Sequence, residues 1–165
     1  MAFIDEIKLM LHSGKGGDGV VRWRHDKSKE LAGPSGGNGG KGGDVYLRAV
    51  ADIGILANYR SIKSFSAEAG QSGMKNSKHG ANGADFFLDV PVGSVITAIG
   101  SDEKLELLKA GESIKILSGG KGGLGNERFK SSTNRTPKEF TLGYAGQSGH
   151  FLIELLLVVD AGLVG

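Results

Sequence analysis

Glycine at every third position constrains the fold of this chain more than any other feature of its sequence. The chain has 29 glycines but only 3 prolines among 165 residues, and this glycine content is roughly two to three times ordinary usage. The glycines cluster in runs, and each run keeps a spacing of three. The clearest examples, which we take as structural glycines, are Gly33, Gly36, Gly39, Gly42, Gly119, Gly122 and Gly125.

A polyproline-II helix is left-handed and has three residues per turn, so glycine at every third position gives it a bare stripe. Another backbone can approach that stripe closely. Collagen uses this packing between chains, but here the runs are short, proline is scarce and ordinary strand sequence separates the runs, which excludes collagen. We therefore expect several short left-handed glycine helices that pack on one another within one chain. The alternative is flexible loops that happen to contain glycine.

Between the glycine runs, apolar residues alternate with polar ones, which is the pattern of half-buried β-strands. Strands are predicted over residues 7–11, 20–24, 45–50, 85–90, 92–99, 113–117 and 151–160. Their spacing is typical of an all-β sandwich or barrel. One short helix is expected around residues 52–58, with Asp52 as its N-cap.

Motifs that resemble nucleotide sites fail on their context. Gly14, Gly16 and Gly19 meet the pattern G-x-G-x-x-G, but the β-like sequence VVRWR follows where a dinucleotide-binding fold needs a helix. A Walker A loop needs Lys followed by Ser or Thr, whereas Lys15, Lys41 and Lys121 each precede glycine. Because His, Asp and Glu do not stand at ligand spacing and no nucleophile has a partner base, we predict no metal site and no catalytic residue.

The C-terminal segment IELLLVVDAGLVG is typical of the first strand of a P-loop domain, since a near-continuous apolar run ends on glycine. On this interpretation Gly165 is the first P-loop glycine. The alternative is the last strand of a barrel with a frayed end. Glu154 interrupts the run, which is too short to span a bilayer, and the absence of cysteine fits a reducing compartment, so we expect a cytoplasmic protein without a membrane anchor.

The net charge of +2 hides an uneven distribution. Residues 22–30, 74–79 and 127–138 together hold ten of the twenty basic residues and three of the eighteen acidic ones, a balance of +7, which leaves −5 for the rest of the chain. These segments adjoin glycine runs, and Trp23 and Phe129 stand beside arginines. The pattern suits phosphate contacts with base stacking, although ordinary solvated loops are the alternative. The candidate RNA-binding residues are Arg22, Arg24, Lys27, Lys29, Lys75, Lys78, Arg128, Lys130, Arg135 and Lys138.

Five runs in this order resemble the N-terminal domain of Obg-family GTPases, and the resemblance covers essentially all 165 residues: GKGGDGVVRWRHDK, GPSGGNGGKGGDV, DVPVGSVI, GGKGGLGNERFKSSTNRTP and DAGLVG. The resemblance implies a mainly β fold in which about six left-handed glycine helices protrude from a small β-barrel. It also implies an Obg-fold domain over residues 1–157, followed at 158–165 by a linker and the first residues of a P-loop GTPase domain. The chain departs from the family pattern at Ser35 and Asn38, where acidic residues are frequent, at Leu142, where proline is usual, and at Gln147, where Glu is usual.

The resemblance further implies binding of ribosomal RNA during assembly of the large ribosomal subunit, with links to cell-cycle and stress control. The expected partners are the large subunit, its rRNA and the GTPase domain of the same chain, and the fragment itself is expected to be monomeric. GTP and Mg²⁺ are expected cofactors of the full-length protein and not of these residues. Two other classes of function stay open: a docking platform that couples the GTPase state to protein partners, and an enzyme in its own right, which the missing P-loop disfavours.

Overall fold

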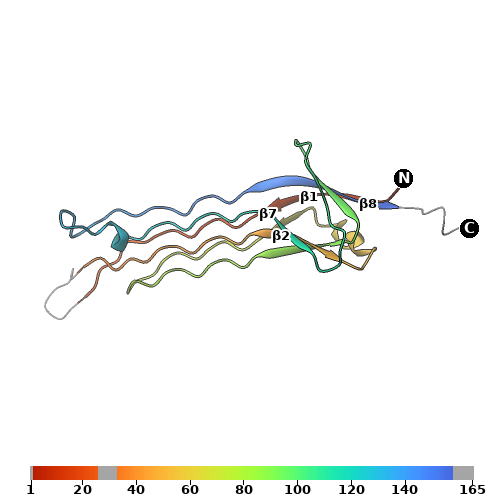
Figure 1. The fold of residues 1–165 in the computed structure, drawn as a ribbon. Helices are drawn as coiled ribbons and strands as arrows, with labels where there is room; N and C mark the ends of the chain where they lie inside the picture. The colour runs from red at the N-terminus through yellow and green to blue at the C-terminus, as the bar shows by residue number, and fades with distance from the viewer. Residues whose placement is uncertain (1, 26–32, 158–165) are drawn as a thin grey trace, which may run out of the picture.

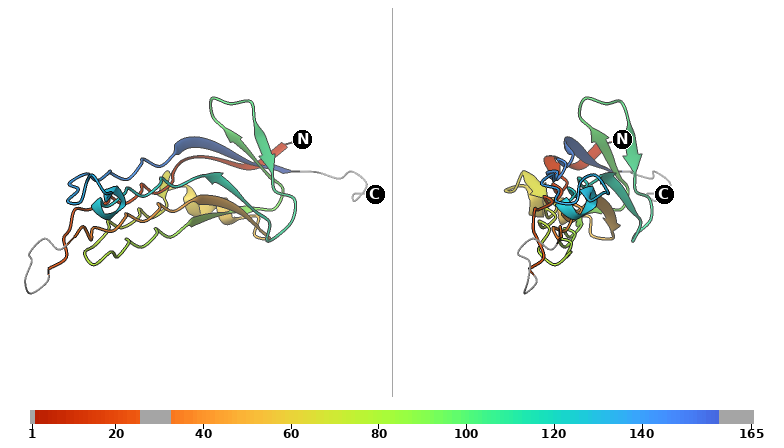
Figure 2. Two further views of the ribbon diagram at one scale, coloured as in Figure 1. Left: turned by 60° about the vertical axis from the view of Figure 1, so that its left-hand side comes forward. Right: turned by 90° about the vertical axis from the view of Figure 1, so that its left-hand side faces the viewer.

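Two β-sheets lie at one end of the molecule, and a bundle of extended glycine-rich segments projects from them (Figure 1). The computed structural model describes residues 2–25 and 33–157. The left view in Figure 2 shows the same long, narrow shape, with the two sheets at one end and the turns of the glycine-rich segments at the other, and the right view looks along its long axis from the end with the turns. Within the described ranges, no helix is long and apolar enough to cross a membrane.

The larger sheet has five strands in the order β3-β1-β8-β5-β6. Its strands are β1 (Ala2–His12), β3 (Ser64–Ser66), β5 (Ser94–Ala98), β6 (Lys104–Glu106) and β8 (Ser148–Leu157). The long antiparallel pair of β1 and β8 puts Ile7 opposite Ile153. Ile7 and Leu9 are buried while Lys8 between them is exposed, so the alternation seen in the sequence is the alternation between the core face and the solvent face.

The smaller sheet has three strands in the order β4-β2-β7, with β2 (Val45–Val50) between β4 (Phe86–Pro91) and β7 (Ser113–Leu117). β2 pairs with β4 in parallel and with β7 antiparallel. Leu47 and Leu88 from this sheet join Ile96 and Ile153 from the larger one in a single buried apolar cluster. The inner faces of the two sheets therefore supply one core, and its burial is the main source of stability at this end.

The prediction of a mainly β fold is confirmed, but the expectation of a closed barrel is wrong. Among the described residues, no strand of one sheet pairs with a strand of the other. The edge strands of the larger sheet, β3 and β6, have only three residues each, so the ladder of hydrogen bonds ends before the sheets can join. The strands form two sheets with open edges instead.

Two local predictions need correction. The predicted strand over residues 20–24 does not form: only an isolated bridge between Trp23 and Pro34 occurs there, because this stretch continues a glycine-rich segment. The predicted helix is the 3-10 helix η1 (Ile55–Tyr59), whose N-cap is Gly54. Asp52 does not cap it, although its Oδ1 accepts a hydrogen bond from the Gly54 N–H at 3.0 Å. The second 3-10 helix, η2 (Asn126–Phe129), was not predicted.

Candidate nucleic-acid interface

Six extended segments, here called arms, connect the two sheets with the far end of the molecule (Figure 1). Arms 1 to 6 span residues 13–25, 33–44, 67–75, 78–85, 118–126 and 137–147. At the far end, arm 3 turns back into arm 4 and arm 5 into arm 6, whereas residues 26–32, between arms 1 and 2, lie outside the described part of the chain. Asn76 and Ser77, both with a φ of 60°, make the turn between arms 3 and 4.

The arms are tied together by backbone hydrogen bonds at every third residue. Gly14 and Gly17 of arm 1 donate to the carbonyls of Gly43 and Gly40 of arm 2, both at 2.8 Å. Their own carbonyls accept from Gly120 and Gly123 of arm 5, again at 2.8 Å. Arm 1 also bonds to arms 3 and 6, and arm 2 to arms 3, 4 and 5, so arms 1 and 2 form the centre of the bundle.

Glycine is needed where these backbones meet. A Cβ added at Gly39 would overlap the carbonyl of Gly17, and one added at Gly122 would overlap the carbonyl of Gly39. The same overlap with the carbonyl of a neighbouring arm occurs at four more of the seven proposed structural glycines: Gly36, Gly42, Gly119 and Gly125. A Cβ at Gly33, the seventh, would meet nothing within 4 Å. The bare stripe is thus a contact surface between backbones along arms 2 and 5.

Side-chain acceptors complete the hydrogen bonding where backbone carbonyls do not reach. The N–H of Asn38 donates to His79 Nδ1 at 3.0 Å, that of Lys41 to Asn82 Oδ1 at 2.9 Å, and that of Asp44 to Asp85 Oδ1 at 2.8 Å. Each pair is 41 residues apart. Arms 2 and 4 are therefore joined by a side-chain ladder that has the same three-residue period as the glycines.

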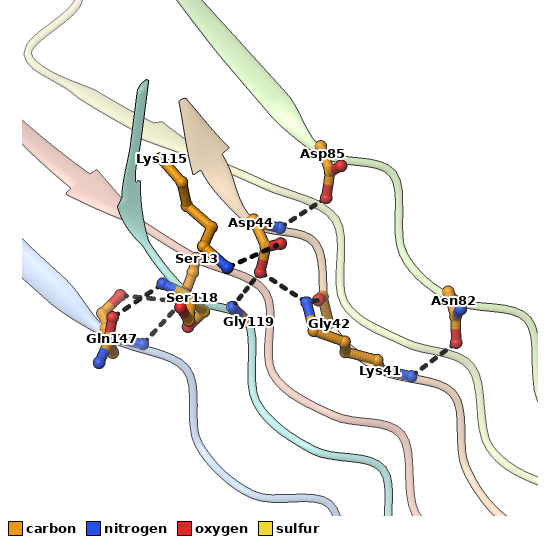
Figure 3. Close-up of polar contacts among 10 residues, drawn as sticks. All are labelled: Ser13, Lys41, Gly42, Asp44, Asn82, Asp85, Lys115, Ser118, Gly119 and Gln147. Carbon is orange, nitrogen blue, oxygen red and sulfur yellow. Dashed lines mark hydrogen bonds and ion pairs between the residues drawn. The ribbon is translucent and has the colours of Figure 1, made fainter. Parts of the chain in front are cut away.

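Asp44 anchors the roots of the arms to the smaller sheet (Figure 3). This buried carboxylate accepts from the Gly119 N–H at 2.7 Å and from Lys41 Nζ at 2.5 Å, and Lys115 Nζ lies 3.9 Å from its other oxygen. Burial alone would raise the pKa of Asp44, but the Lys41 ammonium and the Gly119 N–H outweigh burial and hold it below its usual value. The carboxylate is therefore charged at neutral pH and joins arm 2 to arm 5.

A second polar cluster joins arm 1 to arm 6 beside it (Figure 3). Ser13 Oγ donates to the Ser118 carbonyl and accepts from the Gln147 N–H, both at 2.7 Å, while Gln147 Oε1 accepts from the Ser118 N–H at 2.8 Å. The chain has glutamine here, where Glu is usual in the family it resembles. Gln147 still supplies the acceptor that this joint needs.

Asn126 holds the other end of the bundle together. Its side chain is fully buried. Oδ1 accepts from the N–H groups of Gly36 at 2.8 Å and Arg22 at 3.3 Å, and Nδ2 donates to the carbonyls of Arg22 and Pro137, both at 3.1 Å. One amide therefore joins arms 1, 2, 5 and 6 just before the turns begin. The sequence offered no signal for this role, since a lone Asn carries no pattern.

Eight of the ten candidate RNA-binding residues lie in the described part of the chain, and all eight are exposed. They lie in the turns or at the arm ends beside them, remote from the sheets (Figures 1 and 2). We call residues 22–25, 74–79 and 127–138 the tip segments; their candidate residues are Arg22, Arg24, Lys75, Lys78, Arg128, Lys130, Arg135 and Lys138. Lys27 and Lys29 lie outside the described residues, as does the predicted start of a P-loop domain at 158–165 with Gly165.

The tip segments are electropositive because few carboxylates accompany these cations. No salt bridge among the described residues involves any of the eight. Within the described ranges the nearby acidic residues are Glu127, which lies in the first turn of η2, and Glu139, which accepts a hydrogen bond from Asn134 Nδ2 at 2.6 Å. Trp23 and Phe129, the aromatics predicted to stack on bases, are each partly exposed. The tip segments, which are distant from one another in sequence, thus form one basic end with aromatic rings.

The sheet end of the molecule carries a different feature, an open groove of about 490 Å³ beside β7. Its lining is mostly apolar and includes Ile99 and Ile114, which are 51% and 36% exposed. The groove follows from the open sheet edges described above. In the described residues, no group of three or more His, Cys, Asp and Glu side chains is placed to hold a metal ion.

Comparison with known protein families gives one match over nearly the whole chain. A sequence model of the family described as GTP1/OBG matches residues 4–157. The matched range begins in β1 and ends with β8, so it takes in both sheets and all six arms.

Proposed function

This chain belongs to the GTP1/OBG family, and we propose that its residues 1–157 form the N-terminal, RNA-binding domain of a GTPase that acts in assembly of the large ribosomal subunit. The family accounts for the association with a GTPase. The binding of rRNA and of the large subunit is our proposal, and it rests on the basic tip segments. With them we propose action in the cytoplasm and the family's links to cell-cycle and stress control.

The observation that carries the proposal is the gathering of eight exposed cations at one end of the bundle. Cations that lack carboxylate partners bind RNA phosphates and release the counterions condensed on them. A narrow bundle can enter a crevice in folded RNA that a wider domain could not. The side chains that would make these contacts belong to three tip segments that are separate in the sequence, so they bind as one surface only when the arms are correctly assembled.

We also propose that the arms are left-handed helices of the polyproline-II type. Hydrogen bonds and backbone contacts both repeat every third residue along them, which is the period of that helix. The backbone at Gly125, with a φ of −79° and a ψ of 167°, is close to polyproline-II values. Such arms would be stiff, because each is hydrogen-bonded to at least two other arms, and stiffness would keep the tips presented to a partner.

The GTPase domain is proposed to follow this domain, with its linker and P-loop beginning at residues 158–165. GTP and Mg²⁺ would bind there, and the residues described here would supply no catalytic group. Because β8 ends in the larger sheet, the sheets and the arms would lie between the GTPase domain and the tips. The Obg-fold domain would then act as a rod that couples the nucleotide state to the bound RNA.

The test is RNA and large-subunit binding by two charge-matched triple variants of residues 1–165. Arg128, Lys130 and Arg135 are replaced by Ala in the first, and Lys63, Lys104 and Lys109, which are exposed at the sheet end, in the second. For single-stranded RNA the slope of log affinity against log salt should fall in magnitude by about 2 in the tip variant, since each lost contact removes roughly 0.7. The sheet-end variant should bind as the unaltered chain does. Equal losses from both would show that bulk charge, and not the tips, governs binding. Lys115 is unsuitable for the control because its Nζ lies 3.9 Å from Asp44.

The groove beside β7 favours a second candidate function, a docking platform for protein partners. An apolar groove with exposed isoleucines next to an open sheet edge can accept an extended peptide as an added strand. If protein partners hold the domain on the large subunit, the double variant Ile99→Asp and Ile114→Asp should no longer capture large subunits. If rRNA holds it, this variant should capture them normally. Loss of binding to protein-free rRNA in the tip variant alone would favour the RNA proposal.

A further inference from the structure

Four large apolar side chains are exposed on arms 5 and 6. Leu124 is 37% exposed, Phe140 47%, Leu142 59% and Tyr144 62%. A single exposed apolar side chain needs no explanation, but several on neighbouring segments indicate a contact surface. The four residues lie along the arms between the tip and the root, outside the tip segments.

Backbone hydrogen bonds hold these residues next to one another. Leu124 and Thr141 are joined by two hydrogen bonds, of 2.9 Å from the Thr141 N–H and 2.6 Å to its hydroxyl. The N–H of Tyr144 donates to the Lys121 carbonyl, and its carbonyl accepts from the Gly16 N–H, both at 2.9 Å. The backbone of Tyr144 is thus fully engaged while its ring stays exposed, so little freedom is lost when the ring meets a partner.

The charges around the rings are mostly positive. Lys121, whose backbone bonds to Tyr144, is exposed, and exposed Lys138 precedes Phe140 by two residues. The nearby Glu139 accepts a hydrogen bond from Asn134. Exposed aromatic rings beside lysines are the arrangement that binds single-stranded nucleic acid, because the rings stack on bases and the lysines contact the backbone. An apolar pocket of a protein partner would not require the lysines.

We propose that the exposed side of arms 5 and 6 is a base-stacking surface for single-stranded RNA, in which Phe140 and Tyr144 each stack on an unpaired base and Lys121 and Lys138 contact phosphates. The inference rests on the proposed RNA-binding function and extends it from the tips along the side of the bundle. The two rings are four residues apart on an extended arm, about 12 Å along it and about a third of a turn around it in polyproline-II geometry, so each ring takes its own base.

The experiment measures affinity of residues 1–165 for a short oligouridine RNA at several salt concentrations. The double variant Phe140→Ala and Tyr144→Ala should bind at least roughly 30-fold more weakly, since each ring that stacks on a base is worth about 1 kcal/mol or more. Its salt slope should be unchanged, since no phosphate contact is lost. Replacing both residues by Trp should keep the affinity, while replacing both by Leu should weaken binding as Ala does. Ile53→Ala, at an exposed apolar residue outside the arms, is the matched control and should bind normally.

The outcomes separate this inference from the proposed function. If the Leu pair binds as tightly as the unaltered chain, or the Ala pair loses no affinity while the tip variant does, stacking is overturned and the side of the arms is an apolar surface of another kind. If the unaltered chain binds neither oligouridine nor large subunits, the proposed function itself fails. All substituted side chains are at least 47% exposed, and equal melting temperatures would verify that the variants are folded.

Discussion

Asn126 is bonded to both backbone groups of Arg22: Oδ1 accepts from the Arg22 N–H at 3.3 Å, and Nδ2 donates to the Arg22 carbonyl at 3.1 Å. These residues are 104 positions apart, and Arg22 is a candidate RNA-binding residue. The buried amide therefore positions the end of arm 1 against arms 2, 5 and 6. The exposed end of arm 1 is thus held in place by a polar side chain that is itself fully buried.

Asn126→Ala should destabilise the domain by about 2 to 4 kcal/mol, because four backbone groups, two of them in buried hydrogen bonds, lose their partner at once. For a domain of this size the melting temperature should fall by roughly 5 to 15 °C. Thermal unfolding followed by circular dichroism measures the effect. Asn58→Ala, at an exposed position of η1, is the control and should change stability by less than about 0.5 kcal/mol. A melting temperature close to that of the control would show that water replaces the amide.

Gly39→Ala should lower the free energy of unfolding of the domain by about 1 to 3 kcal/mol, the range typical of overpacking. The added methyl group would overlap the Gly17 carbonyl. This carbonyl cannot move aside as a side chain would, because the Gly17 backbone is hydrogen-bonded to both Gly40 and Gly123. Gly54→Ala is the comparison, since its Cβ would make only an ordinary contact of 3.6 Å with Asp52. Denaturant unfolding should show Gly54→Ala neutral or slightly stabilising. Equal midpoints for the two variants would favour loose glycine loops over packed arms.

Asp44 should make stability depend on pH below its ordinary pKa of 3.8. Because its pKa is lowered in the folded state, its stabilisation is fully present above the unfolded value and is lost as the pH falls through the folded one. Asp44→Asn keeps an acceptor for the Gly119 N–H but loses the charge paired with Lys41, and should cost about 1 to 3 kcal/mol at pH 7. Urea unfolding at a series of pH values should show this difference shrinking below about pH 3.8. A difference that is constant down to the lowest pH would mean that the carboxylate charge contributes nothing.

Residues 1–165 should bind neither GTP nor GDP. No lysine in their glycine runs is followed by Ser or Thr, so the groups that hold the β- and γ-phosphates and Mg²⁺ are missing from this stretch. Isothermal titration calorimetry with each nucleotide and Mg²⁺ gives the answer. Micromolar affinity would reveal a phosphate site that the sequence pattern does not predict.

Local periods in the sequence predicted the local structure well. The alternation of apolar residues placed β2, β4, β5 and β7 to within a few residues, because a strand facing a core must repeat every two residues. The three-residue spacing of glycine pointed to arms in close backbone contact, and the overlap of added Cβ atoms agrees with it at Gly39. The uneven distribution of charge in the sequence singled out the tip segments, where the eight described candidate cations are exposed. The strand expected at 20–24 failed because alternation there continues into an arm, where bonds to other arms replace strand pairing.

Which segments become neighbours was decided only by the tertiary structure. Sequence spacing gave the strands but not their pairing, and the short edge strands β3 and β6 leave two open sheets where a barrel was expected. Asn38 and His79, like Asn126 and Arg22, are partners at large separations that no local period encodes. The physical reason is that φ and ψ preferences and side-chain periods act within a few residues, while an amide finds its acceptor only after the chain has folded. The sequence by itself therefore determined the three-residue glycine period of each arm. Packing between the arms determined that tip segments distant in the sequence present their cations together.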